Sequence, residues 1–436
     1  MTLYNPENAI YLPAINKSFL SAVSKKLPKG RRFPHGVTPE SLIFWKPNPL
    51  WHYPYLLHSI GQYRVGERPH LQMDRLNRIG SILIGDSGGY QIGKGTLNGL
   101  KHVDKGPMAA CDAVKAWRDE RDARRWIKEW IASECEYGMT IDMPLWATGA
   151  SGLRSPFHRC SSDQLIAMTV QNLRYIDRFS PSESRWLNVI QGGDTYLDSI
   201  DWWSEVKWFR RGGYALAGSA GAAGGLVNLL MTILFMRDDG AFEPGQDWLH
   251  VLGVSTPLWA VALTAIQRQL RKRNPALKVS FDSSSPVQLA GKYERVCLTP
   301  SFQNTMSTWT ISSVAAPQRP SLARETCQDV FPFARSPLGC RLKLNELNVR
   351  EGPWEKRQFD SLSNALLVNH NIWVYLDAFS TANQFVANQD DQHVPADYLA
   401  CLAVIEEAFM CSDASKASFV LERNFDLLQK VAPSTC

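Results

Sequence analysis

Polar side chains stand directly after several short apolar runs in this chain of 436 residues. The four that could do the most chemistry are Asp86, Asp142, Gln191 and Asp282. Two carboxylates acting at one sugar carbon are the minimum for retaining glycosyl transfer, one as nucleophile and the other as acid or base. A third carboxylate together with an amide suits the edge of a guanine-like base, which offers adjacent N–H donors and a carbonyl acceptor.

The stretch around Asp86 has two other interpretations. Residues 82–91 read Ile-Leu-Ile-Gly-Asp-Ser-Gly-Gly-Tyr-Gln, an apolar strand signal that ends in a glycine-rich turn. Gly-Asp-Ser-Gly-Gly is also the nucleophile motif of chymotrypsin-like serine proteases. Here it comes early, without an upstream Ala-Ala-His-Cys-like segment, and Tyr90 follows where proline is usual. The other alternative is an ordinary strand-to-helix turn.

The elements that must position these residues alternate along the chain. The predicted strands are residues 9–14, 41–45, 81–86, 139–142, 186–191, 213–218, 249–253 and 277–282. The predicted helices are residues 112–135, 163–179, 203–210, 227–236 and 257–273. Such alternation indicates βαβ units and a parallel sheet. About eight units predict an α/β fold of the (β/α)8 TIM-barrel type, with a doubly wound open sheet as the alternative. No Gly-x-Gly-x-x-Gly segment supports a dinucleotide-binding fold.

A barrel would bring the polar strand ends together. In such barrels the catalytic groups converge on the rim formed by the carboxyl ends of the strands, while the opposite rim serves stability. The predicted rim positions are Asp86, Asp142, Gln191, Gly218, Gly253 and Asp282. Three carboxylates and an amide, with glycines between them, predict a small polar pocket.

Composition limits the class of protein. The net charge of +5 permits a polyanionic partner without demanding one. The nine cysteines are scattered and odd in number, and the polar start of the chain does not resemble a signal peptide. These features predict reduced thiols and a cytoplasmic protein, in the host cytoplasm if the gene belongs to a phage. Residues 212–236 carry no charge, but only 226–236 are strongly apolar, so a buried strand–loop–helix is predicted rather than a membrane span.

Six motifs, ordered along residues 10–380, resemble the tRNA-guanine transglycosylase superfamily. Asp86-Ser-Gly-Gly-Tyr-Gln91 is similar to the family's Asp-Ser-Gly-Gly-Phe/Tyr-Gln, and Asp142 falls where the family has its base-recognising aspartate. The other four are Ile190-Gln-Gly-Gly193, Gly213-Tyr-Ala-Leu-Ala-Gly218, Leu252-Gly-Val-Ser-Thr-Pro257 and the pair Phe281-Asp282. Each motif alone is weakly specific, whereas all six in the family's order are a strong resemblance.

The resemblance implies a covalent mechanism of base exchange. Asp282 would attack the anomeric carbon of a target guanosine and expel guanine, and a glycosyl-enzyme would hold the strand. A free 7-deazaguanine base would then enter, and Asp86 would take its proton as it attacks the sugar. The target nucleotide must leave any base stack to reach the rim, so base flipping or a single-stranded target is implied.

The resemblance also implies how the base is recognised. Asp142, Gln191 and the Gly218 backbone would read the edge of the base. Tyr90 would stack on its face, and Ser87 would line the pocket.

Two departures from the family favour a branch that modifies DNA, exchanging guanine for a 7-deazaguanine. The tRNA enzymes follow the nucleophile with a Thr-Arg-Ser-Gly-Arg-like segment that reads neighbouring bases, whereas no arginine follows Asp282 until Arg295. Bacterial enzymes carry a glutamate near the aminomethyl group of their incoming base, and Ala223 stands at about that position. A neutral pocket suits the nitrile of 7-cyano-7-deazaguanine. The partners implied are DNA, with tRNA as the alternative, and the free base; no membrane partner is expected, and the sequence leaves homo-oligomerisation open.

A third departure concerns zinc. The family's compact Cys-x-Cys-x-x-Cys motif is missing, yet Leu366-Leu-Val-Asn-His370 resembles the segment whose histidine completes the zinc site. A structural zinc is therefore implied, with Cys297, Cys327, Cys340 and His370 as ligands. The alternative is buried free cysteines and a histidine satisfied by other partners.

The predicted domain organisation rests on these assignments. Residues 1–295 form the main part of the barrel, 296–355 an insertion with the zinc site, and 356–436 a helical C-terminal portion that completes and flanks the barrel. A non-catalytic nucleic-acid-binding subunit is a further alternative, which retention of both Asp86 and Asp282 disfavours. Basic clusters at 207–211 and 268–273 are either backbone contacts for nucleic acid or solvated helix ends.

Overall fold

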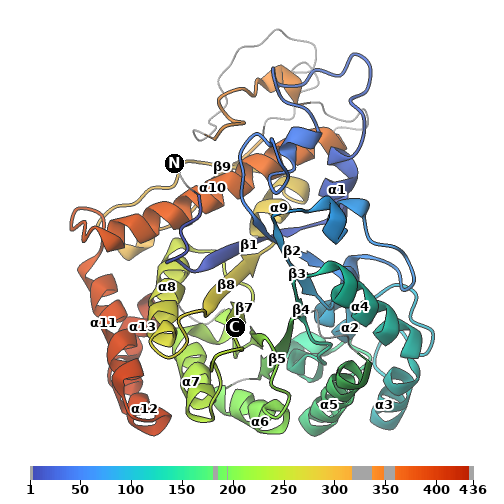
Figure 1. Ribbon diagram of the computed structural model, residues 1–436, viewed down its shortest axis with the longest axis vertical. Coiled ribbons are helices and arrows are strands. Elements are labelled where there is room, and N and C mark those ends of the chain that lie inside the picture. The colour runs from blue at the N-terminus through green and yellow to red at the C-terminus, as the bar shows by residue number, and fades with distance from the viewer. Residues whose placement is uncertain (1–2, 180–184, 194, 317–335, 348–358, 432–436) are drawn as a thin grey trace.

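Eight parallel strands close into a barrel. The computed structural model describes residues 3–179, 185–193, 195–316, 336–347 and 359–431. Each strand pairs with the next, and β8 pairs with β1, so the sheet has no open edge (Figure 1). The strands are β1 (Ile10–Ile15), β2 (Tyr55–Ser59), β3 (Ile82–Asp86), β4 (Tyr137–Met139), β5 (Arg185–Gly192), β6 (Gly213–Gly218), β7 (Trp248–Val251) and β8 (Lys278–Ser283). The predicted (β/α)8 barrel is confirmed.

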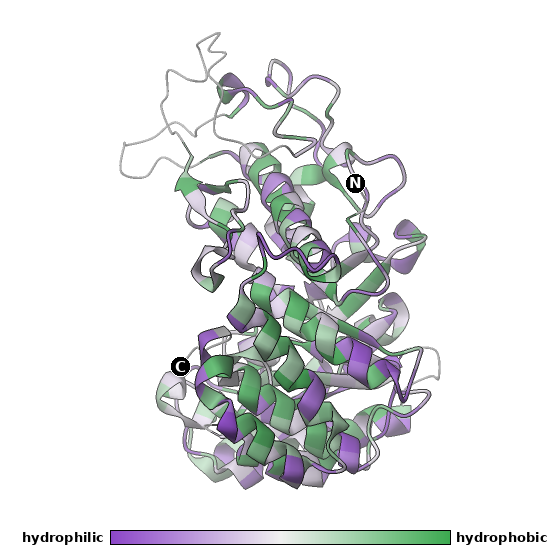
Figure 2. Cartoon of the chain, turned by 90° about the vertical axis from the view of Figure 1, so that its left-hand side faces the viewer, coloured by the Kyte–Doolittle hydropathy of each residue, from purple (hydrophilic) through white to green (hydrophobic). Residues whose placement is uncertain are grey.

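Helices surround the strands. Those within the barrel repeat are α1 (Lys17–Val23), α2 (Gly89–Gly93), α3 (Ala110–Asp119), α4 (Arg121–Glu134), α5 (Ser162–Phe179), α6 (Tyr196–Val206), α7 (Gly225–Asp238), α8 (Pro257–Arg271) and α9 (Ser285–Gly291). The long α10 (Ser361–Ala387) packs on α1, α8 and α9. The last helices, α11 (Ala396–Met410), α12 (Ala414–Arg423) and α13 (Phe425–Val431), pack on α7 and α8. Figure 2, which turns that flank toward the viewer, shows hydrophobic and hydrophilic residues alternating along them, as expected of helices with one buried side.

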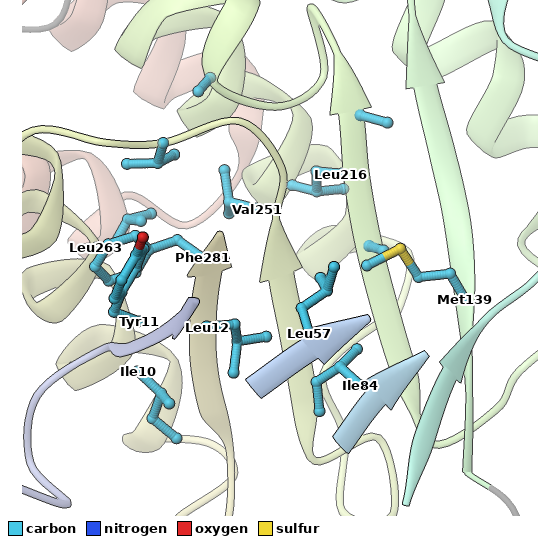
Figure 3. Packing of buried hydrophobic residues seen from close by; sticks show 14 of the residues in the cluster. Ile10, Tyr11, Leu12, Leu57, Ile84, Met139, Leu216, Val251, Leu263 and Phe281 are labelled. Atoms are coloured by element: carbon cyan, nitrogen blue, oxygen red, sulfur yellow. The ribbon is translucent and has the colours of Figure 1, made fainter. Parts of the chain in front are cut away.

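Apolar side chains fill the barrel and the layer between strands and helices. Leu12, Leu57 and Ile84 come from three consecutive strands and lie together in Figure 3, with Met139 and Leu216 beyond them. All five are at most 5% exposed, so the interior is a packed core and not a pore. This core holds the strand ends rigidly, as a site built from several separate strands requires.

The second strand is not where the sequence pattern predicts it. Residues 41–45 are largely buried, but they form a 3₁₀ helix (Glu40–Leu42) and a loop, and the strand is β2 (Tyr55–Ser59). Pro39 precedes the 3₁₀ helix in a helical conformation, with φ −51° and ψ −41°, so the chain enters a helical turn here and not a strand. Residues 41–45 are apolar because they pack into the core from outside the sheet. The two polar residues at the end of β2, His58 and Ser59, hid its strand pattern.

The helix predicted over residues 112–135 is two helices. Glu120 stands between α3 and α4 with a non-helical ψ of 52°. Its buried carboxylate accepts hydrogen bonds from the backbone N–H groups of Lys101, His102 and Val103. Glu120, at the break between the two helices, therefore joins the loop at residues 101–103 to the helix layer. Residues 213–236 form β6, a turn and α7 as predicted; among the described helices, none has the length and apolar composition needed to cross a membrane.

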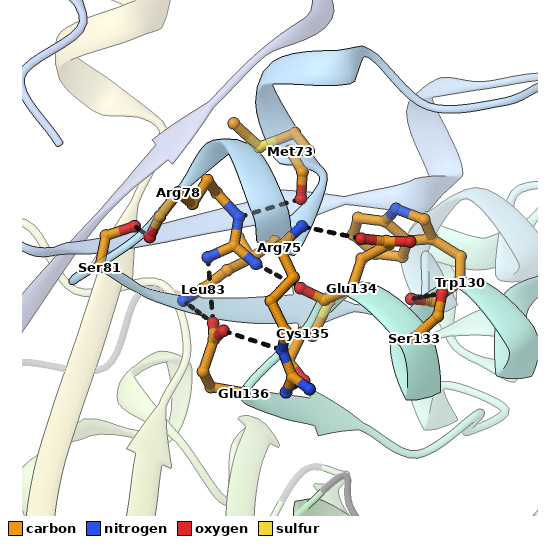
Figure 4. A network of polar contacts seen from close by, with 10 residues as sticks. All are labelled: Met73, Arg75, Arg78, Ser81, Leu83, Trp130, Ser133, Glu134, Cys135 and Glu136. Carbon is orange, nitrogen blue, oxygen red and sulfur yellow. Dashed lines mark hydrogen bonds and ion pairs between the residues drawn. The ribbon is translucent and has the colours of Figure 1, made fainter. Parts of the chain in front are cut away.

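A buried arginine secures the amino ends of β3 and β4 (Figure 4). The Arg78 side chain has no exposed surface, and it donates to the Met73 carbonyl at 2.9 Å and to Glu136 at 3.0 Å. Glu136 also accepts from the Leu83 N–H at 2.7 Å, near the start of β3. These contacts lie at the rim opposite the carboxyl ends of the strands. This rim is thus held by a polar network that serves stability.

Candidate active site

The barrel brings the predicted site residues to one rim. Asp86 is the last residue of β3, Gln191 and Asp282 each lie one residue before the end of β5 and β8, and Gly218 ends β6. Asp142 lies three residues beyond the end of β4, in the loop after that strand. Because the eight barrel strands are parallel, these five positions share the carboxyl-end rim. The closed sheet therefore supplies the convergence on which the predicted pocket depends.

Asp282 is held by groups of the neighbouring strand. Its Oδ1 accepts a hydrogen bond from the Gly253 N–H at 3.1 Å, and His250 Nε2 lies 3.4 Å from the same oxygen. The Asp282 side chain is 16% exposed, so it is reachable from solvent but largely enclosed. An anchored Oδ1 leaves Oδ2 as the oxygen that can act on a substrate. This arrangement suits a positioned nucleophilic carboxylate.

His250 is a site residue that the sequence reasoning missed. It lies in β7 with its side chain fully buried, and its Nδ1 is 2.9 Å from Ser280 Oγ, which accepts from Trp248 Nε1 at 2.7 Å. The Ser280 hydroxyl can donate to Nδ1, whereas Nε2 faces Asp282 Oδ1 at 3.4 Å and forms no hydrogen bond among the described residues. The signal was present, because position 250 lies within the run at residues 249–253 that predicts a strand end. The strand pattern by itself gives this histidine no chemical role.

Asp86 lies in an environment that favours its protonated form. Burial of the carboxyl group raises its pKa, and the nearby charge of Asp282 raises it further. Hydrogen bonds from the Ser59 hydroxyl and from the Gly88 N–H, at 3.0 Å from Oδ1, act in the opposite direction, as does His250. A carboxyl with a raised pKa beside a second carboxylate is suited to giving and taking a proton during a reaction.

Asp142 and Gln191 form a buried pair. Gln191 Nε2 donates to Asp142 Oδ2 at 2.5 Å, while Gln191 Oε1 has no hydrogen-bond partner among the described residues. Burial raises the pKa of Asp142 to about 7, the hydrogen bond from Gln191 lowers it, and the charge of Asp86 raises it. An acceptor left without a partner in a buried polar pocket is commonly satisfied by a ligand or water. The pair offers acceptor oxygens for N–H donors of a base.

Glycines allow the strand ends to approach one another. A Cβ atom at Gly89 would lie 2.7 Å from Asp142 Oδ1, so any side chain there would displace the carboxylate. Gly218 has a φ of +61°, and a Cβ there would lie 2.7 Å from the Gly192 carbonyl oxygen. Both positions require glycine. The glycines near the ends of β3 and β6 therefore shape the pocket around Asp142 and Gln191.

The structure places Ser87 and Tyr90 differently from each other. Ser87 is buried, and its hydroxyl donates to the Thr140 carbonyl at 3.1 Å, which ties the turn after β3 to the segment after β4. Tyr90 is 55% exposed in α2, with its ring centroid 5.4 Å from that of Trp146. Ser87 is thus engaged in the pocket wall, whereas Tyr90 presents an accessible aromatic surface.

The described zinc-ligand candidates do not by themselves form a metal site. His370 is buried, with Nδ1 2.8 Å from Ser336 Oγ and Nε2 2.9 Å from the Cys297 carbonyl oxygen, and burial raises the pKa of the Cys297 thiol to about 12. Cys340 is exposed, and Cys327 lies outside the described residues. Within the described ranges, no three His, Cys, Asp or Glu side chains are grouped to hold a metal. Zinc stays a prediction that depends on residues 317–335, and lack of stoichiometric zinc in the purified protein would end it.

Comparisons with known proteins do not assign this chain to a family. A scan against protein-family models found no match, and a search of curated proteins found none either.

Proposed function

We propose that this protein is a transglycosylase that exchanges guanine in DNA for a 7-deazaguanine base. The observation that carries the proposal is the anchored Asp282 carboxylate next to a second carboxyl, Asp86, whose pKa is raised. Retaining glycosyl transfer needs this pair of groups, one to form the glycosyl ester and one to move the proton.

The proposed reaction has two balanced halves. A carboxylate oxygen of Asp282 bonds to C1′ as the C1′–N9 bond of guanosine breaks, and the departing N9 takes a proton from Asp86. In the second half, N9 of the incoming base attacks C1′ and loses its proton to Asp86, while the ester bond to Asp282 breaks. Each half returns Asp86 to the protonation state that the other requires. A raised pKa favours this role because donor and acceptor forms are then closer in free energy.

The pocket chemistry supports a guanine-like base. Asp142 accepts N–H donors such as N1–H and the 2-amino group, and Gln191 is poised beside it. Ala223, in the 3₁₀ helix Ala222–Gly224 after β6, brings no charge to the position where the family's bacterial enzymes have a glutamate. This favours the uncharged nitrile of 7-cyano-7-deazaguanine as the group at C7.

DNA is proposed over tRNA because of the segment on the C-terminal side of the nucleophile. Beyond Asp282 and Ser283 the chain enters α9 (Ser285–Gly291), which carries no charged side chain. Arginines that read neighbouring bases are therefore missing from this segment. Transglycosylation of tRNA is the alternative with the same chemistry, and a non-catalytic nucleic-acid-binding subunit is the alternative without it.

The decisive experiment is nucleoside analysis after expression with and without the deazaguanine precursor. We expect the modified nucleoside in plasmid DNA, and its appearance in tRNA alone would replace DNA by tRNA as the substrate. Asp282→Ala should abolish both exchange and the trapped covalent adduct. Asp201→Ala, at an exposed carboxylate in α6, is the matched control and should retain both. Exchange that survives in Asp282→Ala would contradict the mechanism.

A further inference from the structure

Two adjoining surface hollows are lined mainly by residues that follow α2 in the chain. Their volumes are about 440 and 480 Å³, and they share Gly95, Asn98 and Lys105 in their walls. The first is also lined by Lys94 and Arg154, and the second by Arg64. No Asp or Glu side chain lines either hollow. In the described part of the chain, Lys105 and Arg154 are exposed and form no ion pair with a carboxylate. The cations that line the hollows thus have no carboxylate partner among the lining residues.

An aromatic surface connects these hollows with the catalytic rim. Tyr90 follows Asp86 by four residues, and the Lys94 ammonium lies 4.6 Å from the centroid of its ring. Trp146, four residues beyond Asp142, contacts the same tyrosine. From the pocket outward the order is carboxylates, aromatic rings and then cations. Bases stack on aromatic rings and phosphates pair with cations, so this order matches that of a nucleotide strand leaving an active site.

The basic clusters that stand out in the sequence lie elsewhere. Residues 268–273 end α8 and precede β8, so they are at the rim opposite the carboxyl ends of the strands. Several are already paired: Lys272 with Glu406 at 3.6 Å, and Arg271 with Glu7 at 3.2 Å. Lys207, at the end of α6, pairs with Asp239 at 3.0 Å. These clusters cannot contact the strand that flanks a nucleotide bound at Asp282.

We propose that the hollows lined by Lys94, Lys105 and Arg154 bind the sugar–phosphate backbone of the DNA strand on one side of the target nucleotide, with Tyr90 and Trp146 as the stacking surface between. The proposal rests on the proposed function for the identity of the strand. A free phosphate or a mononucleotide would use one hollow, whereas a strand spans both, which fits cations distributed along two connected hollows.

The test measures binding without catalysis. Affinity of the Asp282→Asn protein for a fluorescein-labelled single-stranded oligodeoxynucleotide containing guanine is measured by anisotropy across a salt series. Lys105→Ala with Arg154→Ala removes two charges next to the site. Arg268→Ala with Lys272→Ala removes two charges at the opposite rim and serves as the control with equal net charge. Affinity for the free, uncharged 7-deazaguanine base is measured in all proteins to show that the pocket is intact.

The expected result is a difference between the two double variants. Loss of two phosphate contacts to a single strand lowers the salt slope by about 1.4 and weakens binding by roughly tenfold at low salt. The control should bind as tightly as the parent. Equal affinity and slope in both double variants would overturn the proposal. If the hollows bind DNA but no base exchange is found in any nucleic acid, the proposed binding surface is retained and the proposed transglycosylase function is wrong.

Discussion

At the scale of residues, three aspartates on one rim differ because their neighbours differ. Asp282 has a backbone N–H and a histidine beside one oxygen, which fixes the position of its carboxylate. Asp86 and Asp142 are dominated by burial, which raises the pKa of each. The environment thus divides the proposed roles of nucleophile, proton carrier and base reader among residues of one chemical type.

The pKa of Asp142 predicts a pH dependence of base binding. The carboxylate form accepts the N–H donors of the base, and with a pKa of about 7 that form is lost as the pH falls through 7. The dissociation constant of free 7-deazaguanine should therefore be about tenfold lower at pH 8 than at pH 6. Calorimetry in buffers of different ionisation enthalpy checks both the constant and the proton released.

Asp142→Asn separates this effect from titration of Asp86. The variant should bind the base more weakly at pH 8 and with little change between pH 6 and pH 8. A pH dependence equal to that of the parent would assign the titrating group to another residue.

His250 is predicted to position the nucleophile. In His250→Phe the aromatic ring remains but the Nε2–H facing Asp282 and the acceptor for Ser280 are lost. The rate of covalent adduct formation should fall on the order of tenfold, with less effect on the affinity for the base. His250→Gln, whose amide places a donor near the position of Nε2, should recover part of the rate. Equal losses in both variants, at unchanged melting temperature, would indicate that the histidine serves packing alone.

At the scale of elements, the amino ends of β3 and β4 carry contacts that stabilise the fold, and their carboxyl ends carry residues of the candidate site. The amino ends of β3 and β4 are joined through Arg78 and Glu136, whereas their carboxyl ends lead to Asp86 and Asp142. Changes at the two ends should therefore affect different properties of the protein.

Arg78→Met tests this separation. It removes the buried guanidinium shared by Glu136 and the Met73 carbonyl and leaves Glu136 with Arg75 alone, so the free energy of unfolding should fall by about 3 kcal/mol, measured by urea denaturation. Arg68→Met is the control, because Arg68 is 74% exposed in its pair with Asp74 and its loss should cost less than about 1 kcal/mol. The folded Arg78→Met protein should keep its affinity for the free base. Equal stabilities of the two variants would show that the buried network contributes little.

At the scale of the whole molecule, closure of the barrel decides which surfaces can act together. The pocket, Tyr90 and the basic hollows share one face, while the basic ends of α6 and α8 lie at the other. The C-terminal helices α10–α13 pack on the outside of the barrel against α1 and α7–α9 and leave the rim at β3–β6 uncovered by them. Under the proposed function, we expect a long substrate to approach from the side of β3 and β4.

The sequence by itself was sufficient to predict the alternation of strands and helices and to identify the residues at most strand ends. Strands buried on both faces are nearly continuous apolar runs, and a polar residue or glycine that ends such a run is visible without a structure. The same reasoning failed for residues 41–45 and β2, because burial and strand conformation coincide only where the chain lies within the sheet.

Only the tertiary structure decided which side chains are neighbours. His250 and Asp282 are far apart in the sequence, and their contact depends on the pairing of β7 with β8. The pKa of Asp142 depends on burial and on Gln191 from the adjacent strand, and the partners of the basic residues depend on which rim they occupy. Residue types and their order are local properties of the chain, whereas distance, burial and charge pairing arise when the sheet closes.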